Sequence, residues 1–136
     1  MCRRRLHCWA CAVLLQLAGC TKDHKIELWN NTGSAVTIAA ADETLVIQPG
    51  SKGTFGWLWP GEQFTVQMGG TKIILEYQPP PRHFLDETVT ATTYKLQINS
   101  DGFVYVLDPW TKAVAQHLPE QPPGFPLKQK KEEPLR

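Results

Sequence analysis

The chain has 136 residues, a formal net charge of +1, and charged side chains at 20% of its positions. This length suits a single domain, and the scattered charges form no cationic face of the kind that nucleic-acid binding requires. All four cysteines fall within the first 20 residues, so the remaining chain offers no disulfide, no thiolate metal site and no cysteine nucleophile.

The first 20 residues are arranged like an export signal. Three positive charges, Arg3–Arg5, precede a predominantly apolar run, 6–17, and small side chains follow at Ala18 and Gly19. The apolar run is about half of the ~20 residues that a membrane-spanning helix needs. The closing tetrapeptide Leu17-Ala18-Gly19-Cys20 resembles the lipobox of bacterial membrane lipoproteins.

The resemblance implies that residues 1–19 are a signal peptide, cleaved between Gly19 and Cys20, and that the Cys20 thiol carries diacylglycerol, with palmitate-like acyl chains anchoring the protein in a membrane. In bacterial lipoproteins, an Asp directly after the lipidated cysteine resembles a signal for retention in the inner membrane. This chain has Thr21 at that position. The implied location is therefore the cell envelope, on the inner leaflet of the outer membrane and facing the periplasm. The mature domain resembles the small envelope lipoproteins of Gram-negative bacteria as a class, and we assign it to no specific family.

After a short polar tether over 20–25, apolar residues alternate with polar ones at a period of two, which indicates β-strands. We expect about eight strands, separated by turns rich in Gly, Asn, Asp and Pro. The expected ranges are 25–28, 36–40, 45–48, 52–59, 63–68, 72–77, 94–98 and 103–107. They predict an all-β domain over 26–118, a small antiparallel sandwich or partly open barrel. Residues 111–118 are the best candidate for a short helix.

The C-terminal segment 119–136 differs in composition from the domain. It is first proline-rich, which favours an extended backbone, and then charged from Lys128 to Arg136, where we expect disorder. Phe125 and Leu127 could dock on the domain or on a partner, and docking on the domain is the interpretation that we favour.

Three aromatic side chains, Phe55, Trp57 and Trp59, alternate within the expected strand 52–59 and so share one of its faces. Our first interpretation is that they belong to the core. The alternative is a partly exposed binding strip, because flat apolar side chains stack well on sugars and polymers.

No set of residues in the sequence indicates a catalytic centre, a metal site or a cofactor. The histidines beyond the leader are isolated, and neighbouring carboxylates along a strand point to opposite faces. These residues are His24, His83 and His117, and the pairs Asp42-Glu43, Asp86-Glu87 and Glu132-Glu133.

The sequence therefore predicts a lipid-anchored, non-enzymatic domain that binds or braces an envelope protein or a cell-wall polymer. The contact would use a sheet edge, the aromatic strip or the proline-rich tail. The alternative is a glycan- or peptidoglycan-binding module that stacks sugars on Phe55, Trp57 and Trp59, with Tyr105 or Trp110 as possible additions. A cell-envelope hydrolase is the weakest of the three hypotheses.

Overall fold

The computed structural model of the chain describes residues 22–136, so the expected cleavage and lipidation positions, Gly19 and Cys20, lie outside the described residues. Within the described range the structure is almost entirely β, with ten strands and one short 3-10 turn. The strands are β1 (Asp23–Asn31), β2 (Val36–Ala40), β3 (Glu43–Ile47), β4 (Lys52–Gly56), β5 (Gln63–Met68), β6 (Thr71–Glu76), β7 (Leu85–Glu87), β8 (Ala91–Asn99), β9 (Val104–Val106) and β10 (Gln129–Pro134), and the turn is η1 (Arg82–Phe84).

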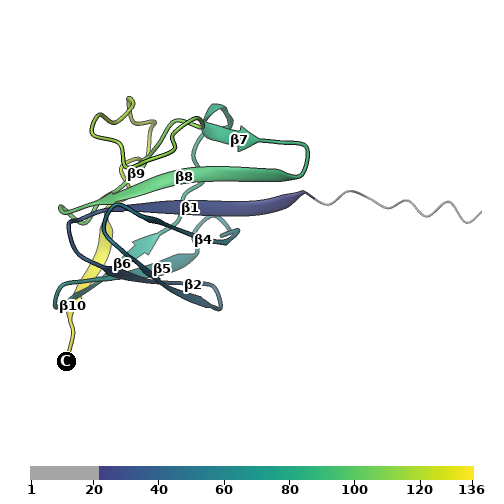
Figure 1. Cartoon of the computed structure of the whole chain (residues 1–136). Helices are drawn as coiled ribbons and strands as arrows, with labels where there is room; N and C mark the ends of the chain where they lie inside the picture. The colour runs from purple at the N-terminus through teal and green to yellow at the C-terminus, as the bar shows by residue number, and fades with distance from the viewer. Residues whose placement is uncertain (1–21) are drawn as a thin grey trace, which may run out of the picture.

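The strands form two sheets that face each other (Figure 1). Sheet A has the order β4-β1-β8-β7, with β9 also paired to β8, and sheet B has the order β10-β6-β5-β2-β3. Neither sheet closes on itself, so the all-β prediction is confirmed in its sandwich form rather than as a barrel.

The core lies between the sheets because alternate residues of each strand point inward. Ile26 and Leu28 of β1 are fully buried, as are Leu96 and Ile98 of β8. The two strands are parallel neighbours, with Asp23 opposite Ala91, and this pair departs from the otherwise antiparallel pattern. Between β1 and β8 the chain passes twice through sheet B, and it forms β4 of sheet A between the two passes and β7 after the second.

The outward side of β8 is buried as well, beneath the loop that follows β9. The Lys95 ammonium group donates a hydrogen bond to the carbonyl of Thr111 (3.0 Å), and the Gln97 amide both donates to and accepts from the Ala115 backbone (3.0 and 2.8 Å). The helix expected over 111–118 is absent. The two buried polar side chains instead hold the backbone of this loop against the outer face of β8.

The proline-rich segment docks on the domain, as the sequence analysis favoured. Leu127 is buried, and its backbone pairs with Val104 in both directions, through hydrogen bonds of 2.8 and 3.2 Å. The Gln121 side chain satisfies the N–H and the carbonyl of Val106 (2.9 and 3.0 Å). The tail thus covers the backbone edge that β9 would otherwise present to solvent.

The expected disorder over 128–136 is wrong for the residues of β10. This strand pairs antiparallel with β6 and completes sheet B. Its charged side chains can point into solvent while its backbone bonds to the open edge of β6, so composition alone misled the prediction. At the other end of the chain, β1 already begins at Asp23. The expected domain bounds 26–118 are therefore too narrow on both sides.

Candidate functional site

The three aromatic residues of the expected binding strip do not share a face. Strand β4 ends at Gly56, and the alternation stops with it. Phe55 is 4% exposed and lies in the core, whereas Trp59 is 69% exposed beyond the end of the strand. The interpretation of all three as one strip is therefore wrong, as is their interpretation as a common core face, since Leu58 occupies the core instead.

Trp57, the middle member, is half-buried and joins an aromatic cluster at the start of β1. Its ring centroid lies 5.0 Å from that of His24 and 5.5 Å from that of Tyr94. Tyr94 is buried, and this burial raises the pKa of its hydroxyl. The three rings pack in tilted contact at one end of the core, with interplanar angles of 56° between His24 and Trp57 and 30° between Trp57 and Tyr94.

Several segments that are distant in sequence meet at this end of the sandwich, which we call the proximal end. Strand β1 begins there, next to the turn that joins β7 to β8, and β4 ends there with Gly56 opposite Lys25. The C-terminus lies at the opposite side of the molecule (Figure 1), which we call the distal end.

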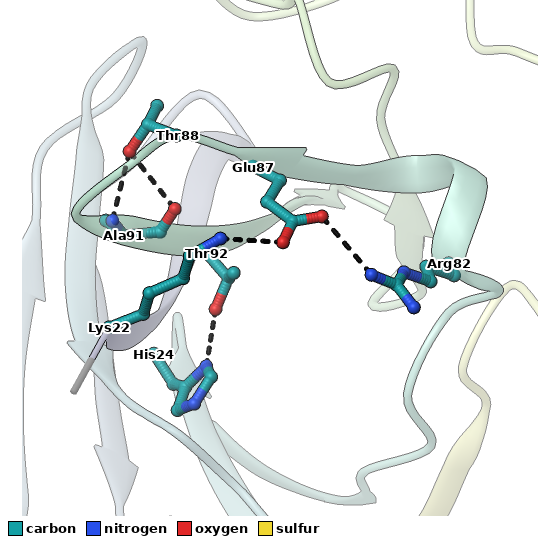
Figure 2. Close-up of polar contacts among 7 residues, drawn as sticks. All are labelled: Lys22, His24, Arg82, Glu87, Thr88, Ala91 and Thr92. Atoms are coloured by element: carbon teal, nitrogen blue, oxygen red, sulfur yellow. Dashed lines mark hydrogen bonds and ion pairs between the residues drawn. The ribbon is translucent and has the colours of Figure 1, made fainter. Parts of the chain in front are cut away.

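A polar cluster of charged and hydroxyl groups surrounds the start of β1 (Figure 2). The Lys22 ammonium group lies 2.8 Å from one carboxylate oxygen of Glu87, and the Arg82 guanidinium lies 3.5 Å from the other. The hydrogen bond from Lys22, reinforced by both positive charges, lowers the pKa of Glu87. These contacts join the first residue of the described chain to the hairpin of β7 and β8.

Close to this ion pair, His24 is hydrogen-bonded through Nδ1 to the hydroxyl of Thr92 (Figure 2). A histidine beside a hydroxyl group is the first requirement of a nucleophilic site. However, Thr92 is only 5% exposed, so the hydroxyl group has little access to solvent. The bond therefore fixes the ring over the aromatic cluster.

A hollow of about 370 Å³ opens beside His24, with Asp23 and Glu43 in its lining. No hydrogen bond joins His24 to either carboxylate among the residues that the structure describes, and Glu43 instead accepts a hydrogen bond from the Gly56 N–H (3.3 Å). Across residues 22–136, no group of three or more His, Cys, Asp or Glu side chains is placed to hold a metal ion.

The other histidines are not brought to this site. His83 packs on Phe84, with ring centroids 4.3 Å apart, and His117 is exposed on the loop after β9. Sequence reasoning found neither Thr92 nor Glu87 as a partner of β1. Nothing in the alternation of hydrophobic and polar residues specifies that β8 pairs in parallel with β1, and that pairing is what brings the cluster together.

No family model matches the chain, and no curated protein or solved structure matches it significantly. In the described part of the chain, no helix has the length and apolar character needed to cross a membrane.

Proposed function

We propose that this protein is a lipid-anchored, non-enzymatic β-sandwich of the bacterial cell envelope, held by an acylated Cys20 in the outer membrane and facing the periplasm. We further propose that it binds an envelope partner through strand addition at β3. The order of charge, apolar run and lipobox in residues 1–20 supports the anchor. The state of the sheet edges supports the mode of binding.

An exposed sheet edge offers unpaired N–H and carbonyl groups to another strand, and proteins usually block such edges. Most edges of this sandwich are blocked. The edge of β9 is covered by Gln121 and Leu127, and β7 has only three residues. Strand β10 carries four charged side chains in a row, together with an irregularity between Gln129 and Lys131.

Strand β4, the outer strand of sheet A, carries Lys52. Among the edges that the structure describes, β3 is the least protected, with Glu43 as its one charged residue, and this observation carries the proposal. It is the outermost strand of sheet B and contains neither lysine nor proline. Val46 points away from the core and is 63% exposed. Strand addition gains affinity from main-chain hydrogen bonds and specificity from alternate side chains. Val46 would supply the side-chain contact of that pairing.

Photo-crosslinking in intact cells tests this proposal. A photoreactive residue at Val46 is compared with one at Glu132, which is exposed on β10 at the opposite edge of the same sheet. We expect a discrete adduct with an envelope component from position 46 and none from position 132. In a second experiment the photoreactive residue replaces Thr44 of β3, and we expect Val46→Lys to abolish the adduct formed from that position. Equal labelling from both edges, or no adduct from β3, would contradict strand addition.

The glycan-binding alternative loses its main support, because Phe55 is buried and Trp59 stands alone beyond β4. Trp110 is 73% exposed but belongs to the loop after β9, and Tyr105 is engaged by Asp101, whose carboxylate accepts its hydroxyl hydrogen at 2.6 Å. We therefore do not assign the exposed aromatics to a shared sugar platform.

A further inference from the structure

The chain between the proposed anchor and the folded sandwich is very short. The tether is shorter than the expected range 20–25, because β1 begins at Asp23 and the Lys22 ammonium group already lies 2.8 Å from the Glu87 carboxylate. Only two peptide units separate Lys22 from Cys20, a span of roughly 7 Å at full extension. The headgroup layer of one leaflet is itself about 5–8 Å thick. A sandwich acylated at Cys20 would therefore have its proximal end at the headgroups.

The turn between β7 and β8 lies directly beside the start of β1 and exposes an apolar side chain to solvent. The Asp23 N–H donates to the carbonyl of Thr90 (3.0 Å), and the neighbouring Val89 is 88% exposed. Thr88 fixes the turn through hydrogen bonds between its hydroxyl and both backbone groups of Ala91 (3.0 and 3.1 Å), as Figure 2 shows.

A second rigid turn at this end exposes Trp59. It lies three residues beyond Gly56, which is opposite Lys25 of β1. The Glu62 carboxylate accepts a hydrogen bond from the Trp59 N–H (2.5 Å), and the Glu62 N–H donates to the Trp59 carbonyl (3.0 Å). These hydrogen bonds fix the backbone of Trp59, so the exposed indole is attached to an ordered turn.

The charges at this end are mixed, so net attraction to anionic lipid does not carry the argument. Lys22, Lys25 and Arg82 are each paired with Asp23 or Glu87. What remains is an exposed tryptophan and an exposed valine on two braced turns, at the end where the anchor would enter. Tryptophan side chains are enriched at membrane–water interfaces, because the ring is apolar and its N–H is polar.

Resting on the anchor proposed above, we propose that the proximal end docks on the lipid surface and places Trp59 and Val89 in the bilayer interface. The acyl chains and these two side chains then form three points of attachment. The domain then has a fixed orientation, with its distal end directed away from the membrane. Strand β3 stays at a constant distance from the membrane surface.

Depth-dependent quenching tests this docking on the acylated mature protein, which starts at Cys20 under the proposal above. Single cysteines replace Trp59, Val89 or, as the distal control, Ser100 in the exposed turn after β8. Cleavage before Cys20 removes the other three cysteines, and Cys20 itself is acylated, so an environment-sensitive dye would react only at the introduced thiol. The proteins are reconstituted into phosphatidylethanolamine–phosphatidylglycerol vesicles, with or without bromine on the lipid acyl chains, and acylation is verified by intact mass.

We expect bromolipid to reduce dye emission at positions 59 and 89 and to leave it unchanged at position 100. An acylated protein whose dye at either proximal position is quenched no more than at position 100 would overturn the docking and leave the anchor standing. A protein without acyl mass on Cys20 would instead overturn the anchor, and the docking with it.

Discussion

Gly53 of β4, in sheet A, lies against the side chain of Ile47 from β3 of the other sheet. A Cβ atom at position 53 would lie 2.7 Å from Ile47 Cδ1 and 2.8 Å from its Cγ1. Ile47 is 2% exposed, so the surrounding core leaves it little room to move. The corner at which the two sheets approach each other therefore needs glycine for close contact.

We predict that Gly53→Ala lowers the free energy of unfolding by about 1–3 kcal/mol, the usual cost of overpacking a core. Gly56→Ala is the matched control on the same strand, because nothing lies within 4 Å of its Cβ position, and its effect should stay within about 0.5 kcal/mol. Denaturant titration of both variants measures the difference. Equal effects would show that Ile47 does not restrict position 53.

Glu87 adds a pH-dependent contact at the same scale. Its pKa is lowered in the folded protein by Lys22 and Arg82, so the ion pair contributes stability above the unfolded pKa of about 4.3. That contribution is lost as the pH falls through the lowered folded value. We predict that Glu87→Gln destabilises the protein at neutral pH and matches wild type in strong acid. Thermal unfolding measured across pH tests this prediction. A difference in melting temperature between the variant and wild type that stayed constant from neutral pH to strong acid would contradict it.

Individual elements show which features the sequence could predict and which it could not. Strands with one wet face, such as β5, follow from period-two alternation and lie where expected, over 63–68. The same alternation predicts that Lys95 and Gln97 face solvent. Instead, the loop after β9 buries both side chains. The partners of β8 depend on long-range pairing, which local alternation does not encode.

The C-terminal strand was missed for a similar physical reason. Charge and proline content predict disorder when a segment must bury its own apolar surface. β10 does not need to do so, because β6 supplies a ready backbone edge and Leu127 anchors the approach to it. The candidate site was missed likewise: His24 was visible in the sequence, but its partner Thr92 follows from the register of β1 and β8.

Removing residues 128–136 should therefore damage the domain instead of trimming a loose tail. We predict a melting temperature lower by roughly 4 °C or more and concentration-dependent aggregation, because β6 becomes an open edge. Deleting only Arg136 is the control, because the Leu135 N–H still donates to the Gly70 carbonyl (2.8 Å). Calorimetry and light scattering on both variants test this. Wild-type behaviour of the longer deletion would contradict a structural role for β10.

The sandwich as a whole has two distinct ends and, at β3, a weakly protected sheet edge. The proximal end carries the proposed anchor, the ion pairs around Glu87 and the two braced turns. The distal end carries the C-terminus (Figure 1). Strand β3 is an outer strand of sheet B. It begins at Glu43, which lines the hollow at the proximal end, and continues from there to Val46 and Ile47. Confinement beside a membrane also raises the effective concentration of any partner held there.

Acylation of a single sulfur atom is the claim on which the location, the docking and the partner search all depend. The most direct measurement compares wild type with Cys20→Ser in fractionated bacteria fed a clickable fatty acid. We predict that the wild-type protein is labelled, loses its leader and sediments with membranes. The variant should be unlabelled, retain its leader and lack the mature form. Equal sedimentation of both proteins at full uncut mass, without label, would contradict it.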